Sequence, residues 1–542
     1  MASTTGATRS MTRATPAAVL VFLFLSAPAP RPQGKGPALL TAAEKSGYRR
    51  TGTTAEVRRF LEELCRRSPY ARLEVLGKSP QGREIPLLVL GKPLPGGPLP
   101  REGRQRPVLY FQADIHAGEV AGKEALQILS RRILLEGDLP GVLEDVVLLV
   151  CPVFNCDGND RISVENRPWQ NGPACGVGTR YNGQGLDLNR DAVKLESREM
   201  RALLSKVILP WDPDLLLDCH TTDGSLHVHP LEAEGPLTLS MDGALRDWNR
   251  DVFLPAVFGR VKEEEGFSFI PYGFFRDRRN PSLGWATFPP LPRYLTNYMG
   301  IRGRLAVLSE AYVYKDFRTR IRATLALARA ILREAAARSG EILVRVRSAD
   351  AGAAALSRRG GGFAVAFRPV PRRKPVVVEG YAERSPARRG LSWKARMAAA
   401  GPLKKWRIPF LADFRVLREV PVPRGWLLPP GAEEAVKLLR RHGLEVERTE
   451  KPLRVRVREF LVERIRREKR PYQGHRLVRL EGGYKEVEVQ VPAGAWRISS
   501  ETPLCRLACW LLEPESPDGL TAWGFLDPWL KEGKPHPVLA LE

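Results

Sequence analysis

Short apolar runs, each followed by a helix-length segment, constrain the fold of the first half of this chain most strongly. Strands are predicted at 73–77, 85–90, 107–112, 146–150, 214–218 and 305–308, and helices at 54–67, 122–135 and 319–336. Parallel strands need a long crossover, usually a helix, and a sheet buried on both faces reads as continuous apolar runs. The order therefore predicts an α/β fold with a mixed central sheet and helices on both faces.

The pattern changes after about residue 339. Short alternating strands are predicted at 342–346, 453–457 and 487–491, with Pro-, Gly- and Arg-rich connectors and a short helix at 433–441. We therefore expect an α/β domain at 40–338 and a basic, β-rich C-terminal domain at 339–542.

The first 30 residues have the composition of a secretory signal peptide. Arg9 and Arg13 precede an apolar stretch at 17–25, and small residues follow it. The chain has no run of 18 apolar residues, so no transmembrane segment is predicted. The expected location is secreted or periplasmic, and export would allow one or two disulfide bridges among the seven cysteines.

The net charge of +24 is concentrated in the second half of the chain. Residues 341–500 contain 36 of the 85 Lys and Arg residues but only 17 of the 61 acidic residues. No nucleic-acid-binding motif accompanies this excess, so nucleic acid is not an expected partner. A solvated basic surface and attraction to an anionic envelope or wall polymer both remain open. His442, His475 and His536, in the same region, are predicted to be surface residues.

Three of the predicted strands end in polar clusters, where open α/β sheets place their sites. His116 and Glu119 follow the strand at 107–112, His220 follows the strand at 214–218, and Glu310 follows the strand at 305–308. Two neutral imidazoles and one carboxylate leave an open position on a tetrahedral zinc ion, which lowers the pKa of bound water to about 7. One zinc ion per chain is therefore predicted, with Glu310 as the carboxylate that takes the proton of the water. Asp114 and Asp218 precede the two histidines, and each could orient an imidazole or cap a turn.

In this order the motifs resemble the zinc carboxypeptidases of the carboxypeptidase A family, over about residues 40–335. The resemblance implies that His116, Glu119 and His220 bind the metal and that Glu310 acts as general base and later as acid. Asp187-Leu188-Asn189-Arg190 matches the family's Asn-Arg pair. That match implies that Asn189 and Arg190 hold the free C-terminal carboxylate of a peptide substrate.

Two positions depart from the family pattern. Gln170 stands where the family has the arginine that stabilises the oxyanion, and Arg161, Arg167 or Arg180 could replace its charge. Phe288 stands where the family has a mobile tyrosine. The nearest substitutes are Tyr294 and Tyr298, of which Tyr298 is preferred. Arg167, Gln170 and Tyr298 are thus further candidate substrate-binding residues.

The segment 512–519 resembles the closing motif of a bacterial subgroup of the family that carries a C-terminal extension. Its role is left open. The function implied by the whole resemblance is zinc-dependent hydrolysis of a C-terminal peptide bond. The alternatives are a zinc amidase or deacylase acting on cell-wall peptides or N-acyl amino acids, and a catalytically silent binding protein that keeps the fold.

Overall fold

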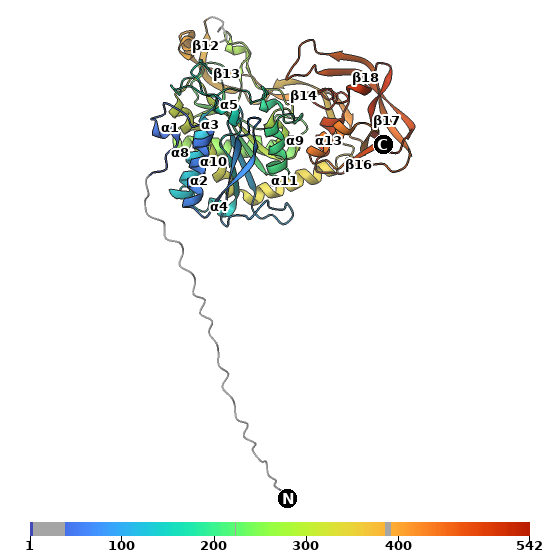
Figure 1. The fold of residues 1–542 in the computed structure, drawn as a ribbon, viewed down its shortest axis with the longest axis horizontal. Helices are drawn as coiled ribbons and strands as arrows, with labels where there is room; N and C mark the ends of the chain where they lie inside the picture. Colours follow the sequence, from blue (N-terminus) through green and yellow to red (C-terminus); the bar gives the residue numbers. More distant parts are fainter. Residues whose placement is uncertain (4–37, 223, 385–391) are drawn as a thin grey trace. The chain divides into compact units, whose positions relative to one another are not determined.

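The computed structural model describes residues 1–3, 38–222, 224–384 and 392–542. Residues 39–542 form one compact unit, shown in Figure 1. The predicted signal peptide falls mainly on residues 4–37, outside the described residues, and stays a prediction. Among the described residues, no helix has the length and apolar character needed to cross a membrane.

An eight-stranded mixed sheet forms the centre of the first half of the unit. Its strand order is β1-β2-β4-β3-β5-β10-β6-β7. The strands β3, β4, β5 and β10 run parallel to one another at its middle. The bounds are β1 Ala71–Lys78, β2 Glu84–Leu90, β3 Val108–Ala113, β4 Val147–Cys151, β5 Leu215–Thr222, β6 Leu231–Glu234, β7 Phe269–Pro271 and β10 Leu305–Tyr312.

Helices cover this sheet on both faces, which confirms the expected fold class. In Figure 1, α2, α3, α8 and α10 group on one side of the strands and α9 lies on the other. The bounds are α1 Ala42–Lys45, α2 Thr54–Arg67, α3 Ala121–Leu135, α4 Val142–Asp145, α5 Cys156–Asn159, α6 Arg198–Leu203, α7 Gly243–Trp248, α8 Leu254–Glu265, α9 Leu295–Ile301 and α10 Phe317–Ala337. Every residue of β3, β4, β5 and β10 is buried, as expected for parallel strands covered on both faces.

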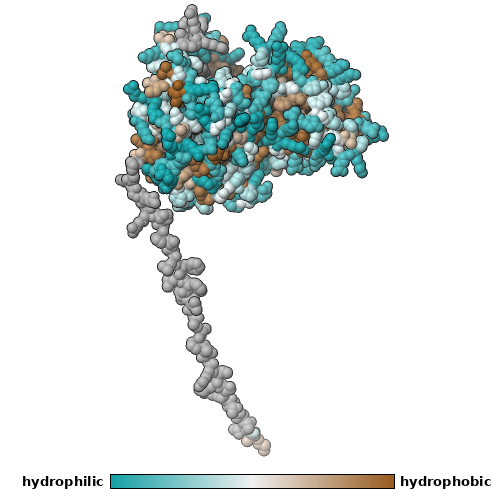
Figure 2. Space-filling view, viewed as in Figure 1, coloured by the Kyte–Doolittle hydropathy of each residue, from teal (hydrophilic) through white to brown (hydrophobic). Residues whose placement is uncertain are grey.

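The later part of the chain is rich in β-structure, as the sequence predicts. A six-stranded sheet has the order β16-β19-β15-β20-β17-β18, and β12 pairs with β13. The bounds are β11 Gly362–Pro371, β12 Val376–Glu383, β13 Ala400–Ile408, β14 Phe410–Pro421, β15 Gly425–Leu428, β16 Glu447–Arg448, β17 Leu453–Arg467, β18 Val478–Val491, β19 Trp496–Ser499 and β20 Lys534–Leu541, with helices α12 Trp393–Ala398, α13 Glu433–Arg441 and α14 Cys505–Leu512. On the face seen in Figure 2 most side chains are hydrophilic and hydrophobic ones form small groups.

The strand predicted at 342–346 is wrong. These residues belong to helix α11, Ser339–Ala354, which follows α10 directly. Ile342, Val346 and Ala349 are spaced three and four apart and are all buried, whereas Val344 is exposed. Burial of one helical face outweighs the β-propensity of the local Ile and Val residues.

Two histidines predicted to lie at the surface are also buried. His442 and His536 have side chains almost fully removed from solvent, and each has hydrogen-bond partners inside the protein. His475 is partly exposed and pairs with Glu196. All seven cysteines, each within the described residues, have free thiols.

Several contacts join residues on the two sides of position 339. A four-stranded sheet has the order β11-β14-β9-β8, in which β8 Phe274–Phe275 and β9 Trp285–Ala286 come from the earlier part. Nη1 of the buried Arg304 lies 2.8 Å from Oδ1 of Asp350 on α11. The hydroxyl of Tyr298 lies 2.7 Å from Nδ1 of His442. The division into domains at this position stays a prediction.

We expect a chain that ends at Arg338 to aggregate when it is expressed. The truncation removes the strand that pairs with β9, the helix that covers α7, one of the two acids paired with Arg304 and the His442 partner of Tyr298. Buried apolar and polar groups therefore become exposed together. Size-exclusion chromatography and thermal unfolding would measure this. A chain that starts at Ala38 is the control and should fold like the full protein. A truncated chain that is monomeric and unfolds cooperatively would contradict the prediction.

Candidate functional site

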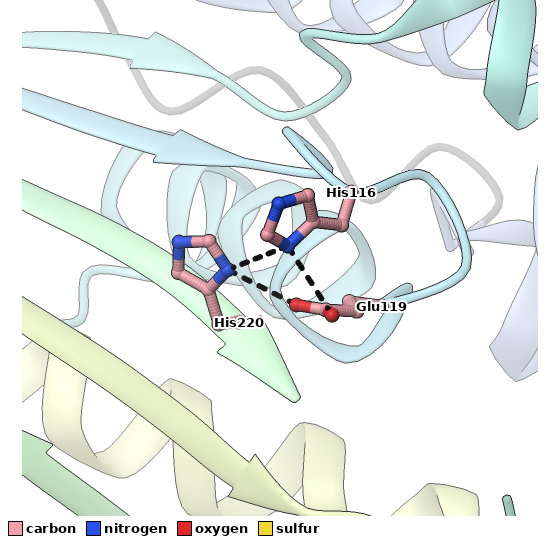
Figure 3. Close-up of side chains that lie close together, drawn as sticks. All are labelled: His116, Glu119 and His220. Atoms are coloured by element: carbon pink, nitrogen blue, oxygen red, sulfur yellow. Dashed lines mark hydrogen bonds and ion pairs between the residues drawn. The ribbon is translucent and has the colours of Figure 1, made fainter. Parts of the chain in front are cut away.

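His116, Glu119 and His220 converge at the carboxyl ends of the central strands (Figure 3). His116 lies in the loop after β3, Glu119 lies two residues before α3, and His220 lies within β5. One donor atom from each lies within 4.8 Å of the others. Nδ1 of His220 is 3.2 Å from Nδ1 of His116 and 3.0 Å from Oε2 of Glu119, and Nδ1 of His116 is 3.3 Å from Oε1 of Glu119.

This donor set fits a tetrahedral metal ion. Donors about 2.0–2.1 Å from a tetrahedral zinc ion lie about 3.3 Å from one another. The two Nδ1 atoms are 3.2 Å apart, and each lies 3.0 or 3.3 Å from a different oxygen of Glu119, so all three spacings are close to this value. Two imidazole Nδ1 atoms and one carboxylate are also ligands that zinc prefers. All three side chains are buried, and a buried carboxylate that faces two imidazole nitrogens can bind a cation.

A carboxylate holds the far nitrogen of each imidazole. Nε2 of His220 lies 2.9 Å from Oδ2 of Asp218, and Nε2 of His116 lies 3.0 Å from Oδ1 of Asp187. Such partners fix the ring orientation and the tautomer, so that Nδ1 faces the metal position. Burial acts to raise the pKa of Asp187, but the neighbouring His116 and nearby guanidinium groups outweigh it, so its pKa lies well below the usual range.

The sequence indicates only one of these two carboxylates. Asp218 was a candidate because it lies two residues from His220, whereas Asp187 lies 71 residues after His116 and no spacing indicates the contact. Asp114, the other candidate, does not reach an imidazole. Neither of its buried carboxylate oxygens has a hydrogen-bond partner, and burial raises its pKa to about 8.

The triad opens into a cavity of about 670 Å³. Glu310 on β10 lines the same cavity, and its Cα pairs in register with that of His220 on β5. The Glu310 side chain is almost fully buried, and burial raises its pKa well above that of a free carboxyl group. The structure thus brings the predicted carboxylate next to the candidate metal ligands.

Asn189 and Arg190 form part of another wall of the cavity. Oδ1 of Asn189 accepts a hydrogen bond of 3.0 Å from the backbone N–H of Leu295. The guanidinium carbon of Arg190 lies 4.5 Å from the centre of the Tyr294 ring. The acids next to Arg190 in sequence have other partners: Asp187 contacts His116 and Arg180, and Asp191 contacts Lys194 and Ser197.

Two candidate substrate-binding residues lie elsewhere than predicted. Tyr298 is fully buried, and its hydroxyl contacts His442 instead of the cavity, whereas Tyr294, four residues earlier, lines the cavity. Gln170 is buried behind the wall, where its Nε2 donates to the carbonyl oxygens of Gly118 and Gly172. A residue distant in sequence contacts each side chain, His442 the tyrosine and Gly118 the glutamine, so neither placement follows from the sequence.

Two arginines bring positive charge to the cavity in place of Gln170. Nη1 of Arg167 donates to Oε1 of Glu119 over 2.8 Å, and Nη1 of Arg180 lies 3.3 Å from Nδ1 of His116. Both side chains line the cavity. Arg161, the third candidate, is exposed in a loop and is not part of the cavity lining.

Comparisons with known proteins agree with this geometry. Residues 57–198, which contain the first two candidate ligands and the Asn-Arg pair, match the family model described as zinc carboxypeptidase. The chain is 21% identical to carboxypeptidase 2 of Trichophyton rubrum over 508 residues, which cover 89% of this chain and 85% of that protein.

Solved structures of similar proteins were also found. A metallo-carboxypeptidase from Burkholderia cenocepacia is 19% identical, covering 55% of this chain and 70% of that one, with a TM-score of 0.39. A metallo-carboxypeptidase from Pseudomonas aeruginosa, in complex with (2-guanidinoethylmercapto)succinic acid, is 20% identical, covering 54% and 70%, with a TM-score of 0.39. These scores are low, so the structures carry no argument about function. The sequence matches show that residues 57–198 resemble a zinc carboxypeptidase domain and that the curated relatives matched along most of the chain are carboxypeptidases.

Proposed function

We propose that this protein hydrolyses the C-terminal peptide bond of peptides with a free terminal carboxylate, using one zinc ion held by His116, Glu119 and His220. One observation carries the proposal: a single cavity contains this triad, the carboxylate of Glu310 and the guanidinium of Arg190. Hydrolysis of a terminal peptide bond needs a metal site, a proton acceptor and an anchor for a carboxylate, and these groups supply all three.

Arg190 would anchor the terminal carboxylate through two parallel charged hydrogen bonds, which a planar guanidinium forms well. Stacking against Tyr294 orients the guanidinium. Asp187 and Asp191, the two acids next to Arg190 in the sequence, form their short contacts with other residues. Asn189 would add an amide donor beside it. Holding the carboxylate fixes which peptide bond lies over the metal position.

When bound, the zinc ion would act as a Lewis acid and lower the pKa of water to about 7. Glu310 would take the proton of the attacking water and give it to the leaving amine. Arg167 and Arg180 would place positive charge where negative charge develops on the carbonyl oxygen, a contribution that the buried Gln170 does not make. The predicted attraction to an anionic wall polymer gains no support from these features.

The metal content of variants tests the triad. We expect His116→Ala and His220→Ala each to lose the stoichiometric zinc of the wild type, because two remaining ligands do not hold the ion against water. Asp187→Asn should bind zinc about 10- to 100-fold more weakly, because it loosens the His116 ring. Zinc analysis after gel filtration and a chelator titration would measure both. The control is His475→Ala, which changes a partly exposed histidine far from the triad in the sequence. This variant should keep its zinc. Full zinc content in both alanine variants would exclude this site.

Glu310→Gln should keep zinc and substrate binding but reduce kcat by several orders of magnitude. The amide has the shape of the carboxylate but cannot accept the proton of the water. Steady-state kinetics on a blocked dipeptide, together with zinc analysis, would measure the effect. Glu165→Gln makes the same change in an exposed residue of the same cavity lining and should leave kcat nearly unchanged. Near-normal turnover of Glu310→Gln would place the proton acceptor elsewhere.

The choice of substrate tests Arg190. The wild type should strongly prefer free-acid peptides over their C-terminal amides. Arg190→Ala should lower kcat/KM on free acids about 30- to several-thousand-fold, which corresponds to a loss of about 2–5 kcal/mol of transition-state stabilisation. Arg190→Lys keeps the charge but loses the two-pronged geometry and should be intermediate. Equal cleavage of acids and amides by the wild type would instead favour an amidase or deacylase.

A further inference from the structure

The motif at the end of the chain contacts a segment that leads into the cavity. Asp518, in the segment 512–519, is fully buried. Its Oδ2 accepts a hydrogen bond of 2.8 Å from the backbone N–H of Arg293, and its Oδ1 lies 3.0 Å from Nε of the same arginine. Oδ1 also accepts a hydrogen bond of 2.7 Å from Nε1 of Trp523. One buried carboxylate is thus held by two hydrogen bonds and by an ion pair with Arg293.

The Arg293 side chain is enclosed by the same part of the protein. Its guanidinium carbon lies 4.8 Å from the centre of the Trp523 ring and 5.1 Å from that of Tyr472. Nη2 donates to the carbonyl oxygen of Pro517 over 3.3 Å. A buried cation that packs against two aromatic rings and pairs with a carboxylate has little freedom to move. Residues from 472 onwards therefore fix the position of Arg293.

The next two residues of the chain reach the candidate carboxylate anchor. Tyr294 stacks on Arg190 at 4.5 Å, and the backbone N–H of Leu295 donates to Oδ1 of Asn189 over 3.0 Å. Arg293, Tyr294 and Leu295 are consecutive, and they contact Asp518, Arg190 and Asn189 respectively. Consecutive Cα atoms are only about 3.8 Å apart, so a shift of Arg293 moves the Tyr294 ring.

Trp523 also supports the loop that follows Arg190. Nζ of Lys194 lies 5.0 Å from the centre of the Trp523 ring and 2.9 Å from Oδ1 of Asp191. The indole ring therefore contacts both Arg293 and Lys194. Both segments that carry the anchor, the one with Tyr294 and the one with Arg190, are held by the same C-terminal residues.

We propose that Asp518 is a positioning residue for substrate binding: through Arg293 and Tyr294 it holds the Arg190 guanidinium in the orientation that binds a terminal carboxylate. The inference rests on the proposed function, since it assumes that Arg190 binds that carboxylate. Asp518 itself touches neither substrate nor metal. The C-terminal motif thus belongs to the substrate site, although every candidate metal ligand lies before residue 339.

Asp518→Asn in the full chain tests the proposal. The amide keeps the shape and one oxygen acceptor but removes the charge that holds Arg293. We expect KM for a free-acid peptide to rise about 3- to 30-fold, the range for substitutions that act on a ligand through an intermediate residue. We expect zinc content and kcat to stay near those of the wild type. The preference for free acid over amide should fall by the same factor as KM rises.

Asp350→Asn is the matched control. It removes the same charge from another buried Arg–Asp pair, with Arg304, whose residues do not line the cavity. We expect a lower melting temperature without a change in KM. Trp523→Phe keeps the ring beside Arg293 but removes one donor to Asp518, and should raise KM by a smaller factor. If Asp518→Asn does not fold, the KM of Trp523→Phe decides the question.

Combining Asp518→Asn with Tyr294→Ala shows whether Asp518 acts through the tyrosine. If it does, the double variant has the KM of Tyr294→Ala alone, because the effects of residues acting in series do not multiply. A product of the two single effects would overturn the proposal. So would an unchanged KM in Asp518→Asn and Trp523→Phe while the wild type still prefers free acids, an outcome that leaves the proposed function standing. Equal cleavage of acids and amides by the wild type would overturn both.

Discussion

Parallel pairing of β3, β5 and β10 is the constraint on which the rest of the site depends. Their backbone hydrogen bonds fix the register, so that Gln112 lies beside Asp218 and His220 lies beside Glu310. Neighbouring strands are about 4.8 Å apart, and parallel strands end at the same edge of the sheet. Side chains from three segments, of which the first and last are nearly 200 residues apart in sequence, therefore meet at one place. The complete burial of the strands keeps that edge rigid.

Charge at this edge is balanced by specific pairs. Asp187 and Asp218 each hold the far nitrogen of one imidazole, and Glu119 accepts hydrogen bonds from Arg167 and from the backbone of Thr221. Buried charges are expensive unless they are paired. These contacts let the acids and imidazoles remain together inside the protein, and they bring the two Nδ1 atoms and the Glu119 carboxylate to one place, as a metal site requires.

The two parts of the chain contribute differently to the enzyme. All the candidate metal ligands and Glu310 belong to the first part, whereas the later part completes a sheet with β9, covers Tyr298 with His442 and holds Arg293 with Asp518. Every residue that lines the cavity lies before position 339, and the later part contacts segments that lead to it.

The helix α2, the buried parallel strands and the His116–Glu119–His220 set could be predicted from the sequence, because periodicity and short motifs are local. Three other features follow from packing in three dimensions: α11 is a helix, Asp187 instead of Asp114 holds His116, and Tyr294 instead of Tyr298 lines the cavity. Each of these depends on which distant residues pack alongside: α7 and α14 against α11, and His442 against Tyr298. Residues differ in their intrinsic helix or strand propensity by less free energy than such burial provides. Packing therefore decides which structure these segments adopt.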